Sequence, residues 1–248
     1  MHDFYLGLKF MFSYFTILPV RFSEDDDLST PKVLASMLFW LPLGGLVLGG
    51  LSVGIFTLLS SFEWLAALVA GVAYMMLYGF LHTEAIMDVA DALYAKHSGK
   101  DAYEVIKEPT VGAMGVLWAV GIMLMKVGGI VTLLLHGGWA YFLSILLISR
   151  LGLLLLFFTQ TFRSSFIGKM QEGFTQTHFL SSLLLFTGIG VFLASWHFLV
   201  LLGAGLLFSH FLANYLGRKL GFLNGDVLGT SLESTETLLF ILGAVLWL

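Results

Sequence analysis

The chain has 248 residues, of which 58% are hydrophobic and only 11% are charged, and its mean hydropathy is +0.93. Soluble domains carry about 25% charged residues, so this composition excludes an ordinary soluble fold and predicts an integral membrane protein. The net charge of −4 gives no sign of a nucleic-acid partner, and the absence of cysteine excludes disulfides.

Membrane-spanning helices are the first elements that the sequence predicts. A straight crossing takes about 20 predominantly apolar residues, and six stretches with few charges reach or approach that length. We predict spans at residues 33–60, 64–82, 111–135, 139–160, 178–194 and 198–216. The predicted fold class is therefore all-α: a polytopic helical bundle that forms one integral-membrane domain over residues 1–248.

Three further features modify this bundle. The apolar N-terminal helix Phe4–Val20 contains Lys9, and it either crosses the membrane or lies in its interface. The segment Pro42-Leu43-Gly44-Gly45 lies inside the first span, where proline predicts a kink or a break. Glu236–Leu248 is too short to cross the bilayer, so we expect a half-helix that packs against the bundle.

The loops between the spans are of two kinds, which alternate along the chain. The turns at residues 60–63, 136–138 and 195–197 contain no Lys or Arg, whereas the other loops carry Lys96, Lys100, Arg163 and Arg218 among others. Basic loops remain on the cytoplasmic side of a membrane. We therefore expect a multi-pass protein of the cytoplasmic (inner) membrane, in which a site at the basic ends faces the cytoplasm.

An acidic helix continues directly from the second span. Glu84, Asp88 and Asp91 share one of its faces, because they are spaced by four and three residues. Carboxylates so placed repel each other, and each would cost about 3 kcal/mol more if it were turned to lipid. A bound cation would relieve both penalties, and oxygen ligands suit Mg²⁺. The alternative is a solvated helix end just above the lipid headgroups.

A second acidic group lies near the C-terminus. Asn224-Gly225-Asp226 is a turn signal, and Thr230 with Glu233 fits a capping box that opens the last helix. Capping does not explain why Asp226, Glu233 and Glu236 gather at the membrane face that the first acidic group occupies. The two groups therefore predict one acidic site on that face.

Two glycines and two intramembrane cations complete the candidate chemistry. Gly112 and Gly115 leave backbone N–H groups accessible at the start of the third span, a place that accepts phosphate oxygens. Small residues there also serve tight helix packing. Lys126 and Arg150 lie within spans, where charges are rare and face a partner or a cavity. They either pair with buried acids or neutralise a phosphorylated substrate, and the sequence supports both.

Taken in order, these segments resemble the cobalamin synthase family, the adenosylcobinamide-GDP ribazoletransferases, over nearly the full chain. His82, Asp88 and Asp91 match the family's His-x-Asp-Gly-x-x-Asp-x-x-Asp-Gly run, whereas Glu84, Ala85 and Ala92 replace its first Asp and its two glycines. The closing Gly-Asp-x-x-Gly-x-x-x-Glu-x-x-Glu motif is intact from Gly225 to Glu236. The other matches are Phe15–Val20, Pro42–Gly45, Gly112, Gly115, Lys126, Arg150, Gly168, Lys169 and Arg218, with Glu108 in place of an Asp.

The resemblance implies a Mg²⁺-dependent transferase that joins α-ribazole, or its 5′-phosphate, to adenosylcobinamide-GDP and releases GMP. This is the last assembly step of adenosylcobalamin. It implies Glu84, Asp88, Asp91 and Asp226 as metal ligands, and His82, Asp88 and Asp91 as catalytic residues. Its implied substrate contacts are Gly112, Gly115, Arg150, Lys169, Arg218, Glu233 and Glu236. The sequence does not decide between a monomer and a homo-oligomer in the lipid bilayer.

Two other functions share parts of this pattern. A CDP-alcohol phosphotransferase also uses membrane carboxylates, a metal and a nucleotide leaving group, but its Asp-Gly-x-x-Ala-Arg…Gly-x-x-x-Asp-x-x-x-Asp signature is absent. An ion-coupled transporter would show internal repeats and acids at the membrane midplane, whereas no repeat is visible and the acids gather at one face. Both rank below ribazole transfer.

Overall fold

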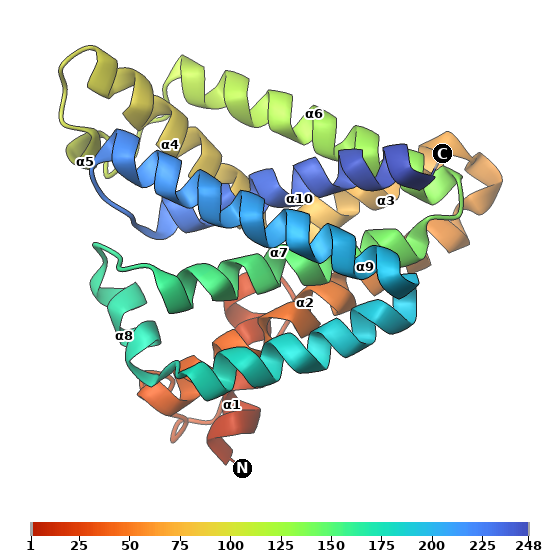
Figure 1. Cartoon of the computed structure of the whole chain (residues 1–248), viewed down its shortest axis with the longest axis horizontal. Coiled ribbons are helices and arrows are strands. Elements are labelled where there is room, and N and C mark those ends of the chain that lie inside the picture. The colour runs from red at the N-terminus through yellow and green to blue at the C-terminus, as the bar shows by residue number, and fades with distance from the viewer. Residues whose placement is uncertain (1, 248) are drawn as a thin grey trace.

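The computed structural model describes residues 2–247, and within this range every regular element is a helix. The predicted all-α class is therefore confirmed. In chain order the elements are α1 (His2–Phe15), α2 (Pro31–Leu58), the 3₁₀ turn η1 (Ser60–Phe62), α3 (Trp64–Leu77), α4 (Leu81–His97), α5 (Ala102–Val105), α6 (Ala113–Leu135), α7 (Trp139–Thr159), α8 (Ser165–Gly173), α9 (Gln176–Leu220) and α10 (Gly225–Trp247) (Figure 1).

Among the described residues, four helices are long and apolar enough to cross a membrane: α2, α6, α7 and α9. A fifth crossing results if α3 and α4, which meet at 77°, are counted as one broken span. The count of six full spans is thus not confirmed. One reason is that α9 contains both of the last two predicted spans. Its backbone leaves helical geometry only at Ala194 and Ser195, at the predicted turn, and Figure 1 shows its two limbs folding back on each other.

The last helix differs most from the expectation. α10 begins at Gly225 and has 23 residues, so the predicted half-helix from Glu236 was wrong, and so was the capping box. The side chain of Asn224 accepts a hydrogen bond from the backbone N–H of Val227 at 3.1 Å, and it starts the helix earlier. Thr230 lies inside the helix instead, where its hydroxyl donates to the carbonyl of Ala85 at 2.9 Å.

The first span is a single uninterrupted helix. α2 has 28 residues and continues through Pro42, so no break occurs there. The following glycine serves close packing: a Cβ atom on Gly45 would lie 2.7 Å from Cδ of Arg150. α1 has 14 residues, fewer than a crossing needs. It packs on α2, where the carbonyl of Phe4 accepts hydrogen bonds from Ser36 Oγ at 2.9 Å and Trp40 Nε1 at 3.3 Å.

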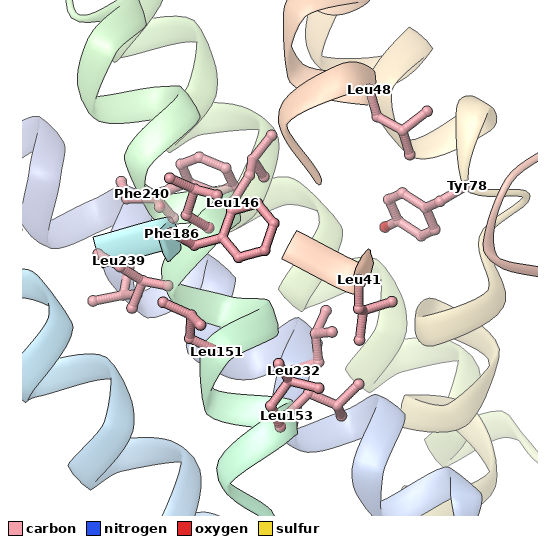
Figure 2. Packing of buried hydrophobic residues seen from close by; sticks show 14 of the residues in the cluster. Leu41, Leu48, Tyr78, Leu146, Leu151, Leu153, Phe186, Leu232, Leu239 and Phe240 are labelled. Carbon is pink, nitrogen blue, oxygen red and sulfur yellow. The ribbon is translucent and has the colours of Figure 1, made fainter. Parts of the chain in front are cut away.

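The core lies around α7, the most deeply buried of the four long apolar helices. Its side chains pack against α2, α9 and α10, and Figure 2 shows part of this cluster, including Leu41, Leu146, Phe186 and Phe240. One continuous apolar cluster therefore joins the N-terminal and C-terminal helices. It fixes the relative positions of the helices that carry the polar residues.

Candidate active site

A cavity of about 520 Å³ opens among α1, α4, α5, α7, α8 and α10 at the basic end of the bundle. His82 of α4 and Asp226 of α10 both line it, and so do Gly225 and Gly229 of the closing motif. The N-terminal segment adds Tyr14 to the wall. The structure thus brings the two acidic segments, which are far apart in the sequence, to one hollow.

Close contact between α4 and α10 shapes this cavity. A Cβ atom on Gly229 would lie 2.7 Å from Cβ of Ala85, so only glycine allows α10 to come this near. Thr230, the residue after Gly229, donates a hydrogen bond from its hydroxyl to the carbonyl of Ala85. Ala85, which fills a glycine position of the motif, is therefore accommodated by the glycine on the opposite helix.

The carboxylates of α4 and α10 lie within electrostatic reach of each other. Asp88 interacts with Asp226 as well as with Glu84 and Asp91. Burial raises the pKa of Asp226, although Asn224 donates a hydrogen bond to it at 2.6 Å, and the charge of Glu84 raises the pKa further. No ion pair among the described residues neutralises Glu84, Asp88 or Asp226.

The chemistry of these donors fits a hard divalent cation, since all of them are carboxylate oxygens. Within residues 2–247, no three His, Asp or Glu side chains converge closely enough to hold a metal ion by themselves. Mg²⁺ keeps several waters and uses one or two carboxylates in many enzymes. Glu84, Asp88 and Asp226 remain available for such a role, which stays a prediction.

Asp91 has a different environment from the other acids. Its carboxylate accepts hydrogen bonds from the backbone N–H groups of Gly112, at 2.5 Å, and Gly115, at 2.8 Å. It therefore caps the N-terminus of α6, where negative charge is stabilising. A Cβ atom on either glycine would lie 2.6 Å from a carboxylate oxygen of Asp91. These N–H groups, predicted to meet phosphate, are occupied by Asp91 in the structure.

A buried ion network lies in the core next to the cavity. Lys126 Nζ is 2.9 Å from Glu233 Oε1 and 2.8 Å from Glu236 Oε1, and Arg150 Nη1 is 2.6 Å from Glu236 Oε2. The two cations balance the two carboxylates, and all four side chains are buried. Of the two roles left open for Lys126 and Arg150, the structure shows pairing with buried acids. The substrate contacts predicted for Arg150, Glu233 and Glu236 stay untested.

Tyrosine hydroxyls complete this network. Tyr74 donates to Glu236 Oε1 at 2.6 Å and accepts from Arg150 Nη2 at 2.8 Å, whereas Tyr78 donates to Glu233 Oε1 at 2.9 Å. The ring of Tyr78 also stacks on His82, with 5.7 Å between centroids. The network therefore reaches the cavity wall through Tyr78.

The remaining predicted substrate residues lie apart from the main cavity. Lys169 of α8 is exposed and does not line it. Arg218 of α9 lines a second cavity, also of about 520 Å³, beside the first. Sequence reasoning missed Tyr103, Lys107 and Arg163 as cavity residues. The sequence marks Lys107 and Arg163 only as basic loop residues, and nothing in the spacing singles out Tyr103.

Comparison with known proteins finds a matching family and similar relatives. A family model described as cobalamin-5-phosphate synthase matches residues 7–245. The chain is 30% identical to an adenosylcobinamide-GDP ribazoletransferase of Brevibacillus brevis, over 95% of this chain and 96% of the relative. It is 31% identical to a protein of the same name from Chlorobium chlorochromatii, over 97% and 96% of the two chains. No solved structure shows a significant match.

The buried network yields a direct test of stability. Lys126→Met removes one cation and leaves two buried carboxylates facing a single arginine, which should destabilise the protein by about 3–5 kcal/mol. The charge-balanced pair Lys126→Met with Glu233→Gln should recover part of that loss. Thermal unfolding in detergent would measure both, with the exposed Lys100→Met as control. A Lys126→Met protein as stable as wild type would show that the network does not hold the bundle together.

Proposed function

Because the chain belongs to the cobalamin-5-phosphate synthase family, we propose that it transfers α-ribazole, or its 5′-phosphate, to adenosylcobinamide-GDP and releases GMP. It is an enzyme of cobalamin biosynthesis, as the shared name of its relatives indicates. The observation that carries the proposal is the cavity that joins His82 to Asp226. The family match favours ribazole transfer over the two alternatives from the sequence.

The reaction requires no covalent bond between the protein and a substrate. A ribazole hydroxyl oxygen bonds to the phosphorus that carries cobinamide, the bond from that phosphorus to the bridging oxygen breaks, and GMP leaves with the bridging oxygen. Catalysis of such a transfer is mainly positioning and charge stabilisation. A cavity lined by residues of six helices and the loops between them, with Asp226 as its carboxylate and Lys107 and Arg163 among its basic residues, supports both.

The hydroxyl proton has to pass to a base within the site. Among the three residues expected on α4 for this role, Asp91 already accepts two backbone hydrogen bonds. The side chains of His82 and Asp88 have no hydrogen-bond partner within residues 2–247, which leaves them free to accept the proton. Glu84, Asp226 and, if His82 is the base, Asp88 are the residues that would hold Mg²⁺ together with water, and the ion would supply positive charge against the diphosphate.

The activity is tested with the detergent-purified protein. Adenosylcobinamide-GDP and α-ribazole 5′-phosphate should yield GMP and the joined product in equal amounts, with unphosphorylated α-ribazole as a parallel acceptor. EDTA should abolish GMP release and added Mg²⁺ should restore it. Asp88→Ala should lower kcat by about 100-fold or more, whereas the exposed Asp25→Ala should match wild type. Mg²⁺-independent GMP release would remove the metal from the proposal, and no release at all would refute it.

We further propose that the cavity faces the cytoplasm. Its support is the gathering of basic loops at one end of the bundle, where α5, α8 and the end of α9 lie together (Figure 1). Both substrates are polar and are nucleotides or nucleotide-derived, so a cytoplasmic opening also suits their supply.

Cysteine labelling tests this orientation, because the chain has no cysteine of its own. A single cysteine in place of Ser61, in the turn at η1, should react with a membrane-impermeant thiol reagent added to intact cells. A cysteine in place of Ser98, after α4, should react only once the membrane is opened. Labelling of the Ser98 variant in sealed cells would reverse the proposed orientation.

A further inference from the structure

Two cations lie over one aromatic ring at the edge of the main cavity. The guanidinium carbon of Arg163 is 3.7 Å from the ring centroid of Tyr103, and Lys107 Nζ is 3.9 Å from it. The ring itself packs edge-on against Phe222 at 5.0 Å. Cations within about 6 Å of an aromatic face are attracted to it. The Tyr103 ring therefore attracts both cations.

This group lies where the two cavities meet. Tyr103 and Lys107 line the main cavity, Phe222 lines the second, and Arg163 lines both. Each cavity has a volume of about 520 Å³. A transferase with two large substrates needs two adjacent binding spaces that share the reacting group. A residue on the wall between them can contact that group from either side.

The backbone fixes Arg163 next to the closing motif. Its N–H donates to the carbonyl of Leu223 at 2.6 Å, just before the turn that leads to Asp226. Arg163 is therefore tied to the segment that brings Asp226 into the main cavity. The loop between α7 and α8 and the start of α10 are held in register by this bond.

The charge of Arg163 has no carboxylate partner among the described residues, whereas Lys107 pairs with Glu104 at 3.1 Å. The guanidinium carbon lies over the Tyr103 ring, and no described carboxylate pairs with the N–H donors of Arg163. A guanidinium fork matches phosphate oxygens in a bidentate manner. The ring thus holds a cation that has no internal anion.

We propose that Arg163, assisted by Lys107, binds the diphosphate of the GDP-linked substrate at the wall between the two cavities, and that Tyr103 is the positioning residue that holds both cations. The identity of this ligand rests on the proposed function. Arg163 and Lys107 line the same cavity as Asp226 of α10. The diphosphate would therefore be bound by these cations within the cavity that the closing motif also lines.

Equilibrium binding of GDP to the detergent-purified full chain tests the proposal without turnover. Arg163→Gln should weaken GDP binding by about tenfold or more, the loss of a charge-assisted hydrogen bond. Arg163→Lys should lie between that variant and wild type. Tyr103→Leu should weaken binding severalfold, because the arginine loses its platform, whereas Tyr103→Phe keeps the ring face and should bind as wild type does. The exposed Arg21→Gln is the matched control.

Steady-state kinetics separate the diphosphate from other ligands. Arg163→Gln and Tyr103→Leu should raise the KM for adenosylcobinamide-GDP, with little change in the KM for the ribazole acceptor. A raised acceptor KM instead would assign Arg163 to the other substrate and overturn the proposal. The proposal is also overturned if Arg163→Gln and Tyr103→Leu bind GDP as tightly as wild type does and unfold at the wild-type temperature. The wild-type protein could also bind GDP through Arg163 and yet release no GMP. That result would refute ribazole transfer, but the diphosphate-binding role of Arg163 would still hold.

Discussion

The buried pairing of Lys126 and Arg150 with Glu233 and Glu236 is the constraint on which the rest of the structure depends. It links α6 and α7 to α10 in the middle of an apolar bundle. An unpaired charge there is expensive, so each member of the network restricts where the helix of its partner can lie. The tyrosines of the α3 region add the fourth element, because Tyr74 and Tyr78 donate to the same two glutamates.

Fixing α10 in this way has a consequence for its N-terminal half. Gly229 then comes against Ala85 of α4, and Asp226 comes within electrostatic reach of Asp88. The closing motif thus combines two tasks on one helix. Its two glutamates hold the bundle together, and Asp226, about two to three turns earlier, lines the cavity. Asp91 plays a similar structural part for α4, since its hydrogen bonds to Gly112 and Gly115 join that helix to α6.

Composition and spacing predicted the helical class, the acidic face of α4 and the importance of the closing motif, because those depend on local periodicity and on the cost of charge near lipid. They could not predict which intramembrane charges pair, since Lys126 and Glu233 are far apart in the chain. The early start of α10 was missed because the helix opens at Asn224, whereas Thr230 offered an equally plausible cap. The stack on Tyr103 joins α5 to the loop after α7, and no sequence pattern links these segments.

The proposed function has α4 and α10 contribute to one divalent-cation site, and Mn²⁺ binding measured by electron paramagnetic resonance tests this proposal most directly. Mn²⁺ favours the same oxygen donors as Mg²⁺. Wild-type protein in detergent should bind one Mn²⁺, and Asp88→Asn and Asp226→Asn should each weaken that binding by about tenfold or more. If Asp226→Asn binds Mn²⁺ as tightly as wild type while Asp88→Asn does not, α10 takes no part in the site and the arrangement is contradicted.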